Sequence, residues 1–226
     1  MSSLTSSRKE ERLSQYVTSE ISERAYNLTM GGTVFYGLIL NIIMCALFGD
    51  MTAGINPVIF LLAYFVCCIA GITMSTKSNH PLVSFLGYNL VVVPVGMVLS
   101  SCITEAGGLS SDIIIQAFAI TTGISTVMIL LSIAYPSFFS KLGGILLASL
   151  FGLIIVEIVF LLLRIPQIAT AWFGAVLFSL YIGYDFWKAQ QYPRTIDNAI
   201  DCAMDIYLDV INLFLKILRI LGSKKD

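Results

Sequence analysis

Five acidic residues lie within, or at the ends of, long apolar segments of this 226-residue chain, and they are the side chains best suited to do chemistry. They are Glu157, Asp185, Asp201, Asp205 and Asp209. If such segments cross a bilayer, a carboxylate at its centre costs about 2.5–3.5 kcal/mol on insertion scales, so acids at that depth are functional candidates. Asp201, Asp205 and Asp209 follow one another at intervals of four residues. This spacing places them along one face of a helix over about 12 Å.

Asp185 is expected to lie beside that acidic face. It stands near the end of the apolar segment that precedes the acidic one, and a short turn joins the two, so the two helices should be antiparallel neighbours. Register alone does not choose between Asp205 and Asp209 as the partner of Asp185. Two carboxylates held close in low dielectric cannot both be charged cheaply, so such a pair can share a proton and respond to pH. Their oxygens also suit a hard cation such as calcium.

Depth within the apolar segments separates the candidates further. Asp185 and Asp209 lie deepest and are the main candidates for a pH sensor, a gate and a metal site. Asp205 is either a wetted position or part of a pathway, and Asp201 is expected to cap its helix or to face water. Glu157, well inside the fifth apolar segment, is expected to hydrogen-bond to a neighbour in its protonated form.

Other catalytic or metal-binding groups are scarce. The single histidine, His80, lies in a short polar loop, and the five cysteines have no paired CxxC spacing. This pattern argues against a histidine-based metal site in the membrane, a disulfide framework and a zinc site. The sequence also has no phosphate loop, no nucleophile elbow, no HExxH and no Gly-x-Gly-Asp string. We therefore expect no enzyme activity and no cofactor, with calcium as the bound or permeant ion.

The composition defines the environment in which these acids must be positioned. Hydrophobic residues make up 57% of the chain, charged residues make up 12%, and the mean hydropathy is +0.87. Soluble domains carry roughly 25% charged residues, so this chain cannot cover a water-facing surface with charge. The net charge of −1 also leaves no broad basic face for nucleic acid. These numbers exclude a soluble enzyme, a nucleic-acid binder and a disordered chain, and they predict an integral membrane protein.

Seven apolar segments have the length of membrane-spanning helices, which need about 20 residues to cross a hydrocarbon core of about 30 Å. They are Ala25–Gly49, Ile55–Met74, Leu82–Cys102, Ile113–Tyr135, Leu142–Leu163, Ile168–Trp187 and Ala199–Leu221. The predicted fold class is an all-α integral membrane protein with seven transmembrane helices. The predicted organisation is a polar, cytoplasmic N-terminal segment over 1–24, one transmembrane domain over 25–221 and a polar tail over 222–226.

The basic residues predict the orientation in the membrane. With the N-terminus in the cytoplasm, the inside carries most of the basic loop residues and the outside loops carry only Arg164. The inside set is Arg8, Lys9, Arg12, Arg24, Lys77, Lys141, Lys188 and Arg194. The last segment disagrees, because Lys216, Arg219, Lys224 and Lys225 would lie outside if it spans, so the side of the C-terminus stays open. Lys216 and Arg219 are expected to reach the membrane interface.

Three stretches resemble the Bax inhibitor-1 (transmembrane Bax inhibitor motif) family, in its bacterial branch. Phe178-Ser-Leu-Tyr-Ile-Gly-Tyr-Asp185 is similar to the ending of the family's sixth helix. Asp205-Ile-Tyr-Leu-Asp209-Val-Ile-Asn-Leu-Phe214 is similar to its last helix, and Gln116-Ala-Phe-Ala-Ile-Thr121-Thr-Gly123 to its fourth. The seven-segment layout extends the resemblance over almost the whole chain.

The resemblance implies a fold and a function. It implies six helices around a central C-terminal helix, and a pH-sensitive calcium leak controlled by two aspartates, which correspond to Asp185 and Asp209. Asp205 matches a further acid found in some members. Members often have an arginine near the cytoplasmic end of the second helix that can latch onto the aspartates, and here Lys77 is the only basic residue at that place. A bacterial plasma membrane is the implied location.

Three hypotheses therefore stand side by side. The first is a passive, pH-gated cation leak, most simply for calcium, that runs past Asp185 and Asp209. The second is a proton-coupled transporter of a small solute that uses the same acids as a relay. The third is a membrane regulatory or interaction protein without flux, in which the intramembrane aspartates would tolerate substitution. The lipid bilayer, calcium and protons are the expected partners, and the sequence names no protein partner.

Overall fold

The computed structural model describes residues 20–50, 52–78 and 80–223, and all regular secondary structure in these ranges is helical. The helices are α2 (Glu23–Phe48), α3 (Pro57–Lys77), α4 (Pro81–Glu105), α5 (Asp112–Ala134), α6 (Pro136–Phe139), α7 (Gly143–Leu162), α8 (Ile168–Ala189) and α9 (Ile196–Gly222). Each predicted segment corresponds to one long helix, with ends that differ by a few residues. The short α6 lies between the fourth and fifth predicted segments, where no helix was predicted.

Local sequence explains where the helices begin and end. Pro81 and Pro136 stand in the first turn of α4 and α6, where the missing N–H costs nothing. The side chains of Ser22 and Thr195 accept hydrogen bonds from backbone N–H groups at the starts of α2 and α9. Gly49 ends α2 with a φ of 57°, a conformation that glycine adopts without strain.

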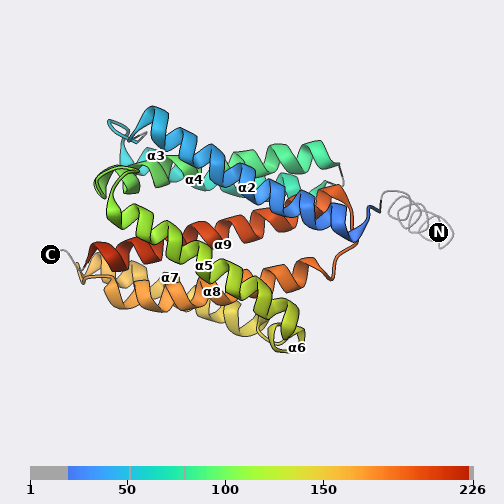
Figure 1. Ribbon diagram of the computed structural model, residues 1–226. Helices are drawn as coiled ribbons and strands as arrows, with labels where there is room; N and C mark the ends of the chain where they lie inside the picture. Colours follow the sequence, from blue (N-terminus) through green and yellow to red (C-terminus); the bar gives the residue numbers. More distant parts are fainter. Residues whose placement is uncertain (1–19, 51, 79, 224–226) are drawn as a thin grey trace, which may run out of the picture.

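The long helices form two groups with α9 between them (Figure 1). The helices α2, α3 and α4 lie on one side of α9, and α5, α7 and α8 lie on the other. Helix α9 packs against α2, α4, α5 and α8 and is buried along most of its length, from Ala199 to Ile220. It begins beside the end of α8 and runs to the opposite end of the bundle, where the C-terminus lies.

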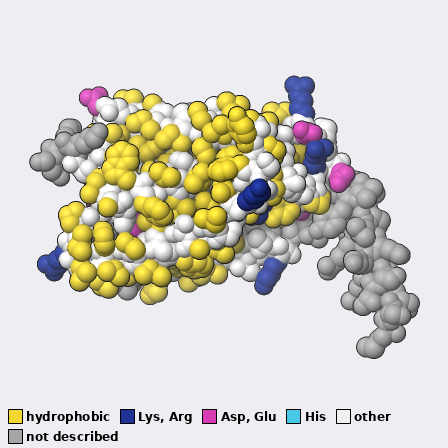
Figure 2. All heavy atoms as spheres, turned by 90° about the horizontal axis from the view of Figure 1, so that it is seen from below, with side chains coloured by type: hydrophobic (Ala, Val, Ile, Leu, Met, Phe, Trp, Pro, Cys, Tyr) yellow, Lys and Arg dark blue, Asp and Glu magenta, His cyan; other side chains and the backbone are white. Residues whose placement is uncertain are grey.

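The outer surface of the bundle is strongly apolar. Figure 2 shows hydrophobic side chains over the middle of one face, with most Lys, Arg, Asp and Glu side chains toward its two ends. Within the described residues, six helices are long and apolar enough to cross a membrane, namely α2, α3, α4, α5, α7 and α8. An apolar surface this extensive is not stable in water. The prediction of an all-α integral membrane protein in contact with lipid is therefore confirmed. Helix α9 is not in this set, because it carries four aspartates together with Lys216 and Arg219.

Part of the predicted organisation lies outside the described residues. This part comprises 1–19, with Arg8, Lys9 and Arg12, and 224–226, with Lys224 and Lys225. The contribution of these five residues to the orientation therefore stays a prediction.

Candidate functional site

The structure brings Asp185 and Asp209 together. Asp185 lies in the last turns of α8 and Asp209 lies near the middle of α9, and these two helices pack side by side. Only 11% of the Asp185 side chain and 7% of Asp209 are exposed. The two carboxyl groups lie close enough for a hydrogen bond to form between them when one of them is protonated. Of the two partners that the sequence left open for Asp185, Asp209 is the one that it approaches in this way.

A hydrogen bond between two carboxyl groups has a chemical consequence. Ionised carboxylates have no hydrogen to donate, so one of the two groups must hold a proton for the bond to form. The Oδ2 atom of Asp209 is buried, and within the described part of the chain no N–H or hydroxyl group donates to it. A proton held between Asp185 and Asp209 would satisfy this buried oxygen.

Lys188 lies between the buried aspartate pair and Asp205. The Lys188 ammonium lies 3.2 Å from Oδ2 of Asp205 and 3.9 Å from Oδ1 of Asp185. The Asp205 side chain is 47% exposed, so its ion pair with Lys188 is weak and open to water. Asp205 thus occupies a wetted position, and Lys188 links it to the buried pair.

A polar cavity lies next to this lysine, and we call it the vestibule. Its lining includes Ser75 and Thr76 of α3, Lys188 of α8, and Asp201 and Asp205 of α9. It contains about 710 Å³ of empty space, counted up to its open mouth. The vestibule lies beside Asp201 and Asp205, toward the end of the bundle at which α9 begins.

Asp201 was expected to cap its helix or to face water, and the first of these two expectations is wrong. Helix α9 begins at Ile196 and Thr195 is its N-cap, so Asp201 lies more than one turn inside the helix. The Ser75 hydroxyl of α3 donates a hydrogen bond to the Asp201 carboxylate. This contact joins α3 to α9, and the only sequence signal for it was a hydroxyl group near the end of an apolar segment.

Two glycines explain how α3 and α4 cross next to this contact. A Cβ atom on Gly87 would lie 2.5 Å from the carbonyl oxygen of Gly71 and 3.1 Å from the backbone nitrogen of Ser75. Only glycine allows the two backbones to approach this closely. The crossing therefore fixes the part of α3 that carries Ser75.

Lys77 does not take the place of the arginine latch. Its side chain is exposed in the last turn of α3, and it forms no ion pair with a described acidic residue. Lys188 is the cation beside the aspartates instead. The sequence missed this role because Lys188 was counted only as a basic residue of a cytoplasmic loop.

A second group of charges lies toward the other end of α9. The Lys216 ammonium forms an ion pair with Glu157 of α7, and the Arg219 guanidinium lies 3.8 Å from the same carboxylate. Arg219 also donates to Oε1 of Gln167, at a distance of 2.8 Å. Glu157 has the hydrogen-bonded neighbour that the sequence predicted, and this neighbour is Lys216. Lys216 is 8% exposed, so its side chain is buried between helices and does not extend to the surface as expected.

Gly174 of α8 makes room for this buried lysine. A Cβ atom at Gly174 would lie 2.8 Å from Cε and 3.0 Å from Cδ of Lys216. The lysine stem therefore packs flat on α8 while its ammonium reaches Glu157 on α7. The described residues contain no group of three or more His, Cys, Asp or Glu side chains placed to hold a metal ion.

Comparison with known proteins shows to which family this chain is related. The family model described as "Inhibitor of apoptosis-promoting Bax1" matches residues 18–226. The chain belongs to the Bax inhibitor-1 family. The resemblance drawn from the three stretches is thereby confirmed, and one bacterial relative is the inner membrane protein YbhL of Escherichia coli, which is 24% identical over 86% of this chain and 74% of its own length.

Two further relatives of this Bax inhibitor-1 family member show how much of a related protein the chain covers. Bax inhibitor 1 of Schizosaccharomyces pombe is 28% identical over 76% of this chain and 64% of its own length. An uncharacterised protein of Helicobacter pylori is 32% identical over 49% of this chain and 48% of its own length. The chain thus matches less than two thirds of the length of either relative.

Proposed function

We propose that this protein is a passive, pH-gated cation leak, with calcium as its main ion, controlled by Asp185 and Asp209. The observation that carries the proposal is the close approach of these two buried carboxyl groups, one on α8 and the other on α9. At low pH the shared proton holds the two helices together. When the pair loses this proton, two adjacent negative charges repel each other in a low-dielectric environment, and α8 and α9 separate.

In the same proposal, α9 is a seventh transmembrane helix at the centre of the bundle. It has 27 residues, and at about 1.5 Å per residue it is about 40 Å long, enough to cross a bilayer. Its charged residues meet partners from other helices: Asp201 meets Ser75, Asp209 meets Asp185, and Lys216 meets Glu157. Such pairing lowers the cost of placing these residues in a membrane.

The proposed orientation puts the N-terminus in the cytoplasm and the end of α9 on the outside. Lys77, Lys141, Lys188 and Arg194 lie in or next to the connections at the end where α2 begins, whereas Arg164 lies in a connection at the other end. This asymmetry follows the positive-inside rule. The relative named as an inner membrane protein supports a bacterial plasma membrane as the location.

The donor set favours a passing ion over a resident one. Two carboxylates supply at most four oxygens, whereas calcium takes six to eight ligands in proteins. The ammonium of Lys188 next to Asp185 also opposes a tightly held cation. We therefore propose that calcium enters through the vestibule with part of its water shell and passes Asp209 without a permanent site. The proposal includes neither a cofactor nor an enzymatic reaction.

Calcium flux in proteoliposomes tests this function. Purified protein is reconstituted with a calcium-sensitive dye inside the vesicles, and flux is measured at pH about 6 and at pH about 8. We expect the parent to conduct several-fold more calcium at the higher pH. Asp209→Asn keeps a hydrogen bond but removes the charge, so its flux should no longer respond to pH. Asp112→Asn is the matched control, since Asp112 is exposed at the start of α5.

The alternatives give different results in the same experiment. Equal flux and an unchanged pH response in Asp209→Asn would overturn the role of the pair. Flux of a small solute that saturates and acidifies the vesicle interior would identify a proton-coupled transporter. No flux in the parent at either pH, under conditions in which a known ionophore releases calcium, would favour a regulatory protein without flux.

A further inference from the structure

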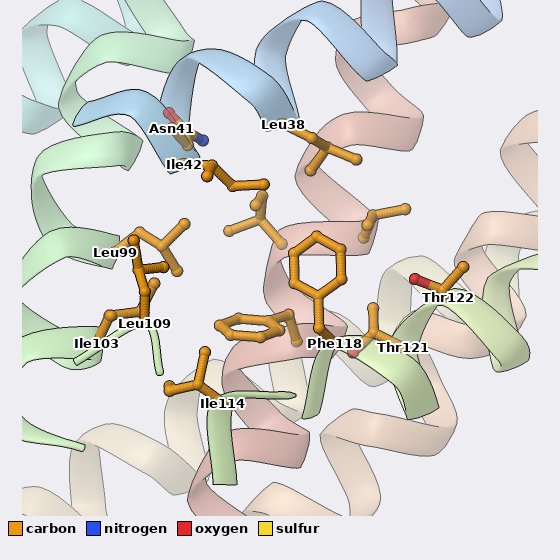
Figure 3. A pocket seen from close by; sticks show the side chains of 13 residues that line it. Leu38, Asn41, Ile42, Leu99, Ile103, Leu109, Ile114, Phe118, Thr121 and Thr122 are labelled. Carbon is orange, nitrogen blue, oxygen red and sulfur yellow. The ribbon is translucent and has the colours of Figure 1, made fainter. Parts of the chain in front are cut away.

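An apolar groove runs between α2 and α5 and reaches the central part of α9 (Figure 3). It contains about 550 Å³ of empty space, counted up to its open side. Leu38 and Ile42 of α2 form one wall and Phe118 of α5 forms the facing wall. Ile211 and Phe214 of α9 form the floor. No charged side chain takes part in its lining.

The groove exists because two helices rest on α9 without meeting each other. Helices α2 and α5 each pack against α9, but no substantial contact joins α2 to α5 (Figure 1). The rings of Phe118 and Phe214 meet edge to face with their centroids 6.1 Å apart, and this contact ties α5 to the floor. The space above the floor is left unfilled by the described side chains.

Polar groups are few in the lining, and two of them are engaged within the protein, whereas Oδ1 of Asn41 has no partner among the described residues. The Thr121 hydroxyl donates to the carbonyl oxygen of Ala117 in its own helix, and the Asn41 amide donates to the Tyr207 hydroxyl. Water occupies a cavity only where it finds two to four polar partners, and cavities with apolar linings stay dry. Water is therefore not the natural content of this groove.

The open side of the groove faces the lipid. Ile42 and Phe118 on its two rims are 38% and 43% exposed, and neighbouring residues on the same helices, such as Ile39 and Ile115, are exposed as well. These residues belong to helices that are long and apolar enough to cross the membrane. In a bilayer, the material in contact with both rims is hydrocarbon.

We infer that a lipid acyl chain occupies the groove and contacts α9 between α2 and α5. An empty groove would deprive its walls of the dispersion contacts that a close-packed interior provides, and an acyl chain restores these contacts without bringing in a polar group. The bilayer supplies acyl chains at very high local concentration, so occupancy does not require a tight site. The inference does not depend on the proposed calcium leak.

The position of the groove brings this lipid close to the candidate site. Val210 and Ile211, which line the groove, directly follow Asp209 on α9. An acyl chain on the floor therefore lies within one helical turn of the aspartate pair, on another face of the same helix. Lipid tails thus become a structural component of the surroundings of α9.

Short-range fluorescence quenching by brominated lipid tests the inference. In a protein whose two natural tryptophans, Trp172 and Trp187, are replaced by phenylalanine, Phe214→Trp places one reporter on the floor of the groove. Ile115→Trp is the lipid-exposed reference on α5. Phe178→Trp is the buried control, because Phe178 lies on α8 within the protein core. Each variant is reconstituted into phosphatidylcholine vesicles with and without bromine on the acyl chains.

We expect bromine to quench Phe214→Trp at least half as strongly as Ile115→Trp, and several-fold more strongly than Phe178→Trp. Quenching of the floor reporter no stronger than that of Phe178→Trp would overturn the inference, because the protein would then have closed the groove. Strong quenching by acrylamide from the aqueous phase would also overturn it, because the groove would then hold water. Leu99→Trp, on the α4 wall, gives a second reporter if Phe214→Trp does not fold.

Discussion

Removing the acidic partner of a buried lysine gives the sharpest test of the charge cluster on α7 and α9. Glu157→Gln leaves the Lys216 ammonium inside the bundle without its counter-ion and with Arg219 nearby. Removing one partner of a buried ion pair costs about 3–5 kcal/mol. The Glu157 side chain is 25% exposed, so solvent screening lowers the expected loss to about 2–3 kcal/mol. For a chain of this size, this loss lowers Tm by about 4–12 °C.

The converse substitution should cost less. In Lys216→Met the flexible side chain still packs on Gly174, and Arg219, 3.8 Å from Glu157, can serve as the counter-ion. We expect a loss of about 1 kcal/mol or less, because no buried charge remains unpaired. The double variant should resemble Lys216→Met more than Glu157→Gln, since it no longer contains the stranded ammonium.

Thermal unfolding of the four proteins in one detergent, followed by circular dichroism, measures this double-mutant cycle. The expected coupling energy between Glu157 and Lys216 is about 2–3 kcal/mol, within the range for contacting residues. If Glu157→Gln melts at the temperature of the parent, or if Lys216→Met is the more damaging change, the buried ion pair described above is not what stabilises this end of α9.

Two further outcomes follow from the local geometry. Gly87→Ala should lower Tm by several degrees, because its Cβ would meet the backbone of Gly71 at 2.5 Å, whereas Gly123→Ala, with open space around it, should leave Tm unchanged in the same melting experiment. Hydrogen bonds, mainly from Ser101 and also from Thr52, hold the pKa of Asp50 below its usual value. These hydrogen bonds stabilise the fold fully above the unfolded pKa of about 3.9, and their contribution is lost as the pH falls through the lower folded value. Melting curves at decreasing pH should therefore show a smaller acid-induced loss in Asp50→Asn than in the parent.

The helical fold could be predicted from the sequence to within a few residues at each helix end. Each long helix corresponds to an uninterrupted apolar segment, and the lengths of these segments reflect the thickness of a bilayer. Helix α6 was missed because Pro136–Phe139 is a single turn, too short for any periodic pattern. Its Phe139 ring packs against Gly183 of α8, a contact that depends on tertiary structure alone.

The proximity of Asp185 to the acidic face of α9 could be predicted, because a short turn joins the two helices. Register alone left Asp205 and Asp209 open as its partner, and the resemblance to the family selected Asp209. The contact between Ser75 and Asp201 and the ion pair between Glu157 and Lys216 could not be predicted in this way. Whether Ser75 faces Asp201 depends on the rotation of α3 about its axis, which the crossing with α4 determines. Likewise, Lys216 turns toward Glu157 because Gly174 leaves space on α8, and hydropathy carries no information about that space.

Charged residues of opposite sign occupy the two halves of α9, and the distance between them bears on the proposed gating. Acids lie in its first half and bases in its second, which is the favourable arrangement for the dipole of a helix. Between Asp209 and Lys216 the helix advances by about 10 Å, and the buried residues along this stretch include Ile211, Leu213 and Phe214. A hydrated cation that passes the aspartates therefore next meets a dry segment. Loss of the shared proton can open a path only if α9 also moves against its neighbours, so a pH-dependent leak requires displacement of the whole helix and not of the Asp209 side chain alone.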